Sequence, residues 1–284
     1  MTLDVLCVGE ALWDLHALGG PFATAERLAM KPGGAAVNVA LALARRRIRV
    51  GLAAVVGNEA LGEALVARVG AAGVEVGLVQ RALARTGVVF AERGDSGSRF
   101  VGYRAVDEPA PRLPKGWSAR VLLLTGLMPS AEHAEVWRSA ARSARRRGAL
   151  VMVDVNARPR AWRDRESGPA FAVIGEADVV KASADDLTVL GLGADGAARM
   201  RARMRRGAVL VTTAGAGAAR AIGRFGEVVR AGGRPIAGEP LGAGDAFTAG
   251  MLLELLGSEP FDEAASWDRA LRRGHALARA HLRR

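Results

Sequence analysis

The stretch Gly242-Ala243-Gly244-Asp245-Ala246-Phe247-Thr248-Ala249-Gly250 decides how this chain of 284 residues is interpreted. Two glycines and an alanine precede an acid, and an apolar run follows from Ala246 to Leu256. This order predicts a loop with small side chains that opens a helix. The first N–H groups of a helix are unpaired and partly positive, and small residues let an anion approach them closely. We therefore expect a phosphate or oxyanion site beside Asp245.

Asp245 in this position favours phosphoryl transfer. A carboxylate beside a bound phosphate can accept the proton of an attacking hydroxyl, while the amides of the preceding loop stabilise charge on the transferred group. The alternative is structural, because acids are favoured at helix starts and glycine-rich turns are common. From local chemistry alone, the structural alternative is the more common case.

The whole stretch resembles the C-terminal signature of the ribokinase-like sugar kinases, the PfkB family. The resemblance implies that Asp245 is the catalytic base and that Gly242, Ala243 and Gly244 form the anion hole. It also implies ATP and Mg²⁺ as cofactors and a small sugar as the phosphate acceptor. The glycine and acid pattern therefore predicts a transferase that acts on a carbohydrate hydroxyl.

Composition limits the other classes of protein. Half of the residues are hydrophobic, enough for a large core, and we expect one domain over residues 1–284. No apolar run is long enough to span a bilayer, and residues 1–10 lack the basic region of a signal peptide. The single cysteine, Cys7, excludes an intramolecular disulfide and a cysteine-based zinc site. We expect a cytoplasmic protein with no membrane partner.

The formal net charge of +11 raises the alternative of a nucleic-acid-binding protein. Arginine carries nearly all of this excess, in clusters such as 45–47, 145–147 and 199–206. The clusters fall at the ends of predicted helices, where cations complement the helix dipole. Aromatic residues are few and are not interleaved with the clusters, so the signature of base stacking is missing. We expect a solvated basic surface and no specific nucleic-acid partner.

The first strand and the residues after it predict part of a sugar site. Residues 3–8 are an apolar run typical of a buried parallel strand, and open α/β sheets bind ligands at the carboxyl ends of such strands. Asp14 follows this strand, where an Asx turn is the structural alternative. The segment from Gly9 to Asp14 is similar to the opening of fructokinase-like members, which implies that Asp14 binds the sugar.

A glycine pair predicts the next part of that site. Gly33 and Gly34 open a predicted helix that continues through Leu43. Together with Asn38 they resemble the N-terminal signature of the same family. The resemblance implies that both glycines let the backbone approach the sugar and that the Asn38 side chain bonds a sugar hydroxyl.

Two segments, near residues 15–32 and 85–107, predict a small sheet beside the main one. The second segment holds two alternating runs, 86–92 and 99–103, joined by a glycine-rich hairpin signal. In the resembling family this sheet is a lid that closes over the sugar and excludes water. Tyr103 and Arg104 are placed to line the underside of this lid and contact the sugar, with packing of the hairpin as an equal alternative for Tyr103. A homodimer through the lid is one option.

The rest of the chain alternates between strand and helix signals, as in a doubly wound parallel sheet. The pattern predicts strands at 50–57, 121–124, 150–155, 178–181 and 209–213, and helices at 58–72, 130–147, 168–175 and 183–190. With the family resemblance, we expect a ribokinase-like α/β fold with a mostly parallel sheet and a small β lid.

Two motifs in this half resemble the nucleotide side of the family. Residues 154–158 are similar to its Asp-x-Asn-x-Arg segment, in which Arg158 would meet a phosphate as a two-pronged donor. Thr212, with Gly215 and Gly217, lies where the family holds nucleotide phosphate and adenine, although the glycine spacing departs from the pattern. A Gly-x-Gly-x-x-Gly match at 191–196 follows a predicted helix and not a strand, so we do not expect a dinucleotide site there.

A third motif, at residues 181–186, replaces the Asn-x-x-Glu of the family, which orients magnesium and its water shell. Lys181 opens this motif and is assigned to the phosphates. Ser183 and Asp186 stand at the two signature positions, so Asp186 would act on the metal only through water. The same pair is an ordinary capping box, which is the interpretation that we favour.

The loop before the anion hole also departs from the family. Many members carry Asp-Thr there and bind a monovalent cation, whereas this chain has Glu239 and Pro240. Proline stiffens the loop by itself, so we expect a reaction that needs magnesium but not potassium. The alternative is a non-catalytic member that binds sugar or nucleotide. Among acceptors we rank a fructose-like ketose first, a ketodeoxy sugar acid paired with Arg104 second, and nucleosides third.

Overall fold

The computed structural model describes residues 2–94, 97–100, 109–126, 130–157, 166–236, 238, 241–257 and 263–283. For residues 91–94 and 97–100 it describes the backbone only. Tyr103, Arg104, Arg158, Glu239 and Pro240 lie outside the described residues.

A central eight-stranded sheet runs in the order β14-β13-β12-β11-β10-β9-β1-β4. Its strands are β1 (Leu3–Val8), β4 (Val50–Ala53), β9 (Ala119–Thr125), β10 (Leu150–Asp154), β11 (Val179–Ser183), β12 (Val209–Thr213), β13 (Ala219–Gly223) and β14 (Gly226–Arg230). Neighbours from β4 to β12 pair in parallel, and β13 and β14 add an antiparallel edge. The predicted mostly parallel sheet is confirmed.

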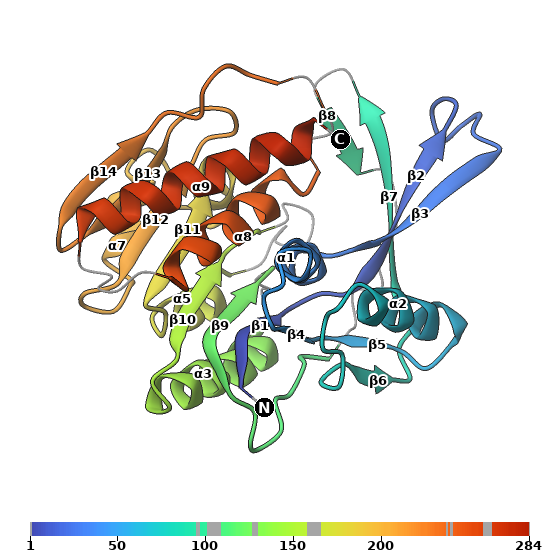
Figure 1. The fold of residues 1–284 in the computed structure, drawn as a ribbon, viewed down its shortest axis with the longest axis horizontal. Coiled ribbons are helices and arrows are strands. Elements are labelled where there is room, and N and C mark those ends of the chain that lie inside the picture. The colour runs from blue at the N-terminus through green and yellow to red at the C-terminus, as the bar shows by residue number, and fades with distance from the viewer. Residues whose placement is uncertain are drawn as a thin grey trace.

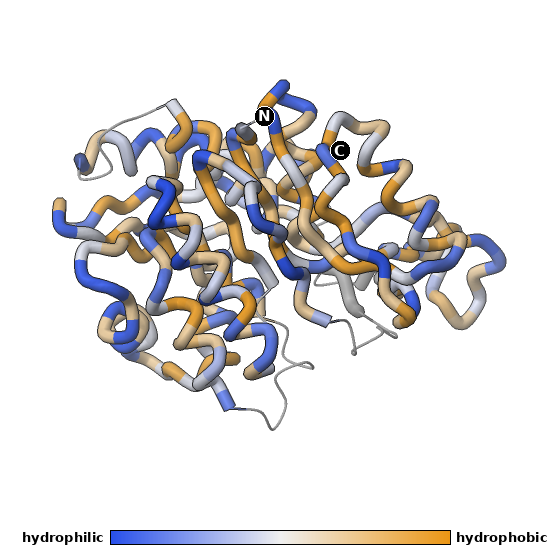
Figure 2. The backbone as a smooth tube through the Cα atoms, turned by 90° about the horizontal axis from the view of Figure 1, so that it is seen from below, coloured by the Kyte–Doolittle hydropathy of each residue, from blue (hydrophilic) through white to orange (hydrophobic). Residues whose placement is uncertain are grey.

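Two hydrophobic cores lie on the two faces of this sheet. Successive side chains of a strand point to opposite faces, and β1 follows this rule: Val5 and Cys7 belong to one core, Leu6 and Val8 to the other. Because both faces are covered, the parallel strands read as continuous apolar runs and not as alternating ones. Figure 2 shows hydrophobic stretches through the middle of the molecule and hydrophilic ones mainly along its periphery.

Helices cover both cores. One side carries α1 (Ala35–Ala44), α8 (Ala243–Leu255) and α9 (Ala264–Leu282), which lie together in Figure 1. The other side carries α3 (Ala131–Arg146), α5 (Gly168–Ile174), α6 (Ala184–Val189) and α7 (Gly196–Arg201). Helix α2 (Ala60–Ala71) buries Leu65 and Val69 against the first core. Among the described residues, no helix combines the length and apolarity needed to cross a bilayer.

A second, four-stranded sheet extends beside the main body (Figure 1). It contains β2 (Leu12–Leu18), β3 (Arg27–Gly33), β7 (Gly87–Gly94) and β8 (Gly97–Phe100), in the order β3-β2-β7-β8. The β7 and β8 strands pair antiparallel with Gly94 opposite Gly97, as the hairpin signal predicted. We call this four-stranded sheet the lid sheet.

The predicted single strand over residues 50–57 is wrong. The chain forms β4 (Val50–Ala53) and β5 (Val55–Gly57), and β5 leaves the main sheet to pair with β6 (Gln80–Ala82) in a separate two-stranded sheet. Every residue from Val50 to Gly57 is buried, Ala54 included. The run therefore carries no hydropathy change that would mark where the chain changes sheets.

Helices α8 and α9 pack unusually closely at two glycines. A Cβ atom on Gly250 would lie 2.5 Å from the Arg273 carbonyl oxygen and 2.8 Å from Gly274 Cα. A Cβ on Gly274 would lie 2.9 Å from the ring of Phe247. Real Cβ contacts are not this short, so both positions need glycine. Gly250 of the signature therefore serves helix packing, and Phe247 fills the space over Gly274.

Candidate active site

The carboxyl ends of the parallel strands gather polar residues at one edge of the main sheet. Asp154 ends β10, Lys181 lies beside it on β11, and Thr212 lies on β12, next to Ala182 of β11. Open α/β sheets bind ligands at this edge. The edge therefore holds Lys181 and Thr212, which the sequence assigns to phosphate and nucleotide.

Helix α8 begins at this site with the predicted loop. Gly242 is its N-cap residue and has φ 83°, a left-handed conformation that favours glycine. Among the described residues, no side chain caps the helix. The backbone N–H groups of Ala243, Gly244 and Asp245 are the first three of the helix and have no intrahelical acceptor. The arrangement is the one expected for an anion hole.

Asp245 lies in the first turn of α8, is 5% exposed, and is held by two amides. Asn38 Nδ2 on α1 donates to one carboxylate oxygen at 2.8 Å, and Asn156 Nδ2, just after β10, donates to the other at 3.1 Å. The carboxylate is thus fixed in orientation by two elements. The sequence predicted Asn38 as a sugar ligand but did not predict that it holds Asp245.

Asn156 was quoted in the sequence only as part of a motif, and its contact with Asp245 was missed. It has φ 40°, a left-handed conformation in which asparagine is enriched. This conformation turns the chain after β10, so that the side chain reaches α8. An asparagine directly after a buried strand is a signal for such a turn, but it does not identify the partner 89 residues away.

Beside the start of α8 lies a buried cluster of Asp154, Lys181 and Thr248. Lys181 Nζ lies 3.0 and 3.1 Å from the two Asp154 oxygens, and Thr248 Oγ1 donates to Asp154 Oδ2 at 2.6 Å. All three residues are at most 4% exposed. A Cβ atom on Gly244 would lie 3.5 Å from Lys181 Nζ, so the ammonium group lies next to the backbone of the first turn of α8.

The two charges of this cluster respond to burial and to each other. Burial works against the charged form of Lys181, but Asp154, Asp186 and Asp245 outweigh it and raise the pKa of Lys181 above its ordinary value. Burial also raises the pKa of Asp154, opposed by Lys181 and Thr248. The lysine is therefore a fixed positive charge beside the N–H groups of α8.

The predicted sugar residues lie together at the base of the lid sheet. Asp14, on β2, is 8% exposed, and one of its oxygens would lie 2.9 Å from a Cβ placed on Gly33, with the other closer still. Gly34 has φ 94° and would place a Cβ 2.9 Å from the Glu10 carbonyl carbon. Gly34 is thus required by its φ and by the close backbone of Glu10, whereas a methyl group on Gly33 would have to displace the Asp14 carboxylate. The two glycines lead directly into α1 and Asn38, which joins this group to Asp245.

Asp186 forms the capping box that the sequence favoured. Its Oδ2 accepts hydrogen bonds from the backbone N–H and the hydroxyl of Ser183, both at 2.7 Å. Its Oδ1 accepts from the Ala157 N–H at 2.7 Å. The carboxylate therefore fixes the chain that carries Asn156, and both of its oxygens are engaged. The described residues contain no group of three or more His, Cys, Asp or Glu side chains that could hold a metal.

Thr212, Gly215 and Gly217 lie at the end of β12 and in the turn that follows it. Gly215 has φ 52°, and the Gly217 N–H donates to the Ala214 carbonyl at 2.7 Å. In the sheet order, β12 lies two strands from β10 and Asp154. The structure thus places the three residues along the same edge as Lys181.

His281 contacts the anion-hole loop and was not found from the sequence. It lies in the last turn of α9, and its Nε2 is 2.7 Å from the Leu241 carbonyl oxygen. A Cβ on Gly242 would lie 3.2 Å from His281 Cε1. The imidazole therefore supports the residue that sets the start of α8. A lone histidine near a chain end gives no sequence signal for this contact.

Comparison with known proteins agrees with this geometry. The model of the pfkB family carbohydrate kinases matches residues 2–284. A fructokinase from Klebsiella pneumoniae is 31% identical over 269 residues, which cover 90% of this chain and 85% of that protein. A crystal structure of a PfkB protein from Polaromonas sp. JS666 has a TM-score of 0.80 at 28% identity, covering 98% of this chain and 95% of that one. A fructokinase from Xylella fastidiosa with bound ATP has a TM-score of 0.79 at 28% identity, covering 98% and 90%.

The family match spans both sheets and both signatures, and the fold has the ribokinase-like topology that the signatures implied. The chain therefore belongs to the pfkB family of carbohydrate kinases and is a phosphotransferase that acts on a sugar hydroxyl.

Proposed function

We propose that this protein transfers the γ-phosphate of ATP to a hydroxyl of a small ketose, with fructose as the preferred acceptor. One observation carries the proposal: Asp245 lies at the open start of α8 with both oxygens oriented by Asn38 and Asn156. The similarity to fructokinases, one of them with bound ATP, supports the choice of donor and acceptor.

Asp245 acts as the general base in this proposal. The sugar hydroxyl oxygen attacks the γ-phosphorus, its O–P bond forms as the bond to the β-phosphate oxygen breaks, and the hydroxyl proton goes to Asp245. The two amide donors keep the carboxylate from rotating away from the hydroxyl. In this proposal the predicted anion hole, made by the N–H groups of Gly242, Ala243 and Gly244, stabilises the charge that develops on the transferred group.

Lys181 adds a fixed charge to the phosphate side. Its ammonium lies beside the backbone of Gly244 and is held in place by Asp154, which Thr248 in turn hydrogen-bonds. A preorganised charge in a buried site costs no rearrangement when the phosphoryl group moves. We propose that Thr212, Gly215 and Gly217 bind the nucleotide farther along the edge, and that Arg158 meets a phosphate.

Mg²⁺ belongs to the proposal as the ion that accompanies ATP and neutralises its phosphate charge. The described residues do not fit a direct protein site for it, because both Asp186 oxygens are used in the capping box and toward Ala157. We therefore assign the ion to the nucleotide and draw no catalytic step through a protein-bound metal.

The sugar lies, in this proposal, between Asp14, Gly33, Gly34 and Asn38. Asp14 accepts hydrogen bonds from sugar hydroxyls, and the glycines leave room for the ring. Closure of the lid sheet, which includes Asp14 on β2, would exclude water as a competing acceptor. Tyr103 and Arg104 remain predicted contacts, and Arg104 would favour a ketodeoxy sugar acid as the second choice.

A panel of acceptors tests the function. Fructose, other ketoses, aldoses, a ketodeoxy sugar acid and nucleosides are each incubated with ATP and magnesium, and ADP release is measured. We expect the highest kcat/KM with fructose. A nucleoside as the sole productive acceptor would contradict the substrate ranking, and no turnover with any acceptor would favour a non-catalytic binding protein.

We also propose a homodimer through the lid sheet. Leu18 and Leu28, on β2 and β3, are 45% and 42% exposed, and apolar side chains of this size favour a covering partner. Analytical ultracentrifugation should show a dimer that Leu18→Arg with Leu28→Arg converts to a monomer. A monomeric unmodified protein at assay concentration would contradict this part.

A further inference from the structure

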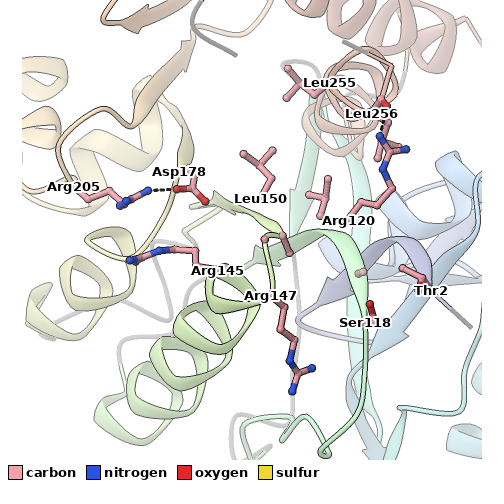
Figure 3. Close-up of a pocket in the computed structure, with 14 residues that line it drawn as sticks. Thr2, Ser118, Arg120, Arg145, Arg147, Leu150, Asp178, Arg205, Leu255 and Leu256 are labelled. Carbon is pink, nitrogen blue, oxygen red and sulfur yellow. Dashed lines mark hydrogen bonds and ion pairs between the residues drawn. The ribbon is translucent and has the colours of Figure 1, made fainter. Parts of the chain in front are cut away.

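Figure 3 shows a cavity lined by residues at the starts of parallel strands. Asp245 lies at the other edge of the main sheet, where these strands end. We call the cavity the basal cavity. Its lining comes from the starts of β9, β10 and β11 and from the last turn of α8, and its volume is about 570 Å³. Strand β9 has seven residues, so the two edges are about 20 Å apart at roughly 3.3 Å per residue. The basal cavity is therefore separate from the site described above.

The lining of the basal cavity is strongly basic. Four arginines contribute to it, from three different segments: Arg120, Arg145, Arg147 and Arg205. The acid in the lining is Asp178, which already pairs with Arg205 and accepts the Val151 N–H at 2.9 Å. This carboxylate is therefore committed to the protein and does not offset the other three arginines.

The surroundings add more positive than negative charge. In the described part of the chain, six arginines share three carboxylates around the cavity: Arg49 and Arg120 at Asp4, Arg138, Arg142 and Arg145 at Glu176, and Arg205 at Asp178. Arg147 has no acidic partner within the same part. Each carboxylate offsets one guanidinium, so the region keeps a clear positive excess.

Arg120 and Arg147 are the two guanidinium groups with most capacity left. Arg120 donates to the Leu256 carbonyl at 2.7 Å, and Arg147 donates to the Trp117 carbonyl. Arg120 also lies 3.9 Å from Asp4, a carboxylate that Arg49 holds more closely, at 3.2 Å. The two carbonyl acceptors are neutral and use one donor each, whereas a guanidinium has five. Planar guanidinium groups match the oxygens of a phosphate in two-pronged contacts. Both side chains therefore keep a charge and several donors for a ligand.

We infer that the basal cavity binds a small phosphorylated anion of at least two negative charges, at a site distinct from the proposed ATP site. The volume lies in the range of small-molecule sites, about 300–1,000 Å³. Ser118 and Thr2 add hydroxyl groups to the lining. Leu255 and Leu256 place the end of α8 against the ligand, so the helix that starts at the anion hole ends at this cavity.

A nucleic acid fits the basal cavity less well. Single-stranded nucleic acids are held by aromatic rings on which bases stack. Trp117 is the aromatic residue beside the cavity arginines, but it is only 9% exposed and Arg147 covers its ring at 5.4 Å from the centroid. The ring face is therefore taken, and the cavity offers charge without a stacking platform.

Pyrophosphate is the probe for this site. Isothermal titration calorimetry of the full chain with pyrophosphate, at constant ionic strength, should give saturable binding. Arg120→Gln with Arg147→Gln should weaken it about tenfold or more, because hydrogen bonds to charged groups are lost. The matched control is Arg45→Gln with Arg146→Gln, which removes the same charge from exposed positions outside the cavity. This control should bind like the unmodified protein.

Ser118→Glu provides a variant that cannot be dismissed as misfolded, because this side chain is exposed and adds a negative charge to the lining. It should weaken pyrophosphate binding while the thermal melt stays unchanged. Equal affinity in the unmodified protein and in both cavity variants would overturn the inference, since pyrophosphate would then bind elsewhere, the anion hole included. Tight RNA binding that is lost in the cavity variants and resists pyrophosphate would overturn it in favour of a nucleic-acid site.

Discussion

Replacement of Asp245 by asparagine tests the proposed chemistry most directly. The two side chains have the same shape, so the packing of α8 is kept. The carboxylate now accepts one amide from Asn38 and one from Asn156. An asparagine in its place presents an NH₂ group to one of these two donors, and that neighbour must turn its own amide over to avoid two facing donors.

The expected loss of rate is large compared with the expected change in stability. Removal of a general base typically lowers kcat by about 10²–10⁴. That range corresponds to about 3–5 kcal/mol of transition-state stabilisation. Two effects on stability oppose each other. The variant weakens the hydrogen bonds to the charged carboxylate, which are worth about 1.5–3 kcal/mol. It also removes the repulsion between Asp245 and Asp154 that helps to raise the pKa of Asp154. We therefore expect a small shift in the thermal melt and a large loss of turnover.

The assay is ADP release with fructose, ATP and magnesium, together with calorimetric binding of ATP and a thermal melt. Asp245→Asn should lose turnover and keep most of its ATP affinity, since the N–H groups of the helix start are unchanged. Asp185→Asn is the matched control, because Asp185 is an exposed acid in the first turn of another helix, α6. Turnover of Asp245→Asn within a few-fold of the unmodified enzyme would refute the assignment of the base.

Three further predictions follow from individual contacts. Gly33→Ala should raise KM for the sugar with little change in KM for ATP, because the new methyl group displaces the Asp14 carboxylate; an unchanged sugar KM in initial-rate kinetics would argue against Asp14 as a ligand. Thr248→Val removes the hydroxyl that donates a hydrogen bond to Asp154, and it should lower the free energy of unfolding, measured in urea, by about 1–2 kcal/mol. The lost hydrogen bond costs about 1.5–3 kcal/mol, and the additional buried methyl group returns about 0.8 kcal/mol. Thr248→Ser, which keeps the hydroxyl, should retain more activity than the valine variant. Burial lowers the pKa of His275 below its ordinary value of 6.5. As the pH falls below 6.5, the unfolded chain therefore takes up the proton first, and the stability of the folded protein declines until the pH passes the folded pKa. His275→Gln should flatten the plot of melting temperature against pH in this range, and an unchanged slope would contradict the prediction.

Much of the fold was predictable because strands and helices leave periodic signals. The strand at residues 3–8 and the helix from the Gly33-Gly34 pair to residue 44 lie where the sequence predicts them. Helix α9 was not predicted, although its buried residues Trp267, Ala270, Leu271 and Gly274 have helical spacing. The point at Ala54 where β4 ends and the chain passes to β5 gives no signal in the sequence, because the residues on both sides are equally apolar and buried.

The candidate site was predictable only in part, for a different physical reason. The glycines and the acid of the signature form a local pattern, so the loop that opens α8 and the place of Asp245 in its first turn were predictable. The partners that orient Asp245 come from α1 and from the end of β10, far apart in the chain. Asp186 combines both kinds of contact. Its capping box with Ser183 is a local motif and was predicted, whereas its hydrogen bond from the Ala157 N–H depends on β10 and β11 lying side by side. Contacts between elements require the topology, which a local pattern does not contain.

The signature on α8 encodes packing as well as chemistry, and helical spacing separates the two. Asp245 and Thr248 are three residues apart and so lie on one face, where they meet Asn38 and the buried Asp154. Phe247 and Gly250 are also three apart and face α9, where the ring covers Gly274. Because the two faces belong to one rigid helix, a misplaced α9 would move the start of α8 and Asp245 with it. The glycine that closes the signature is thus required for the position of the acid, although its own contacts are with α9.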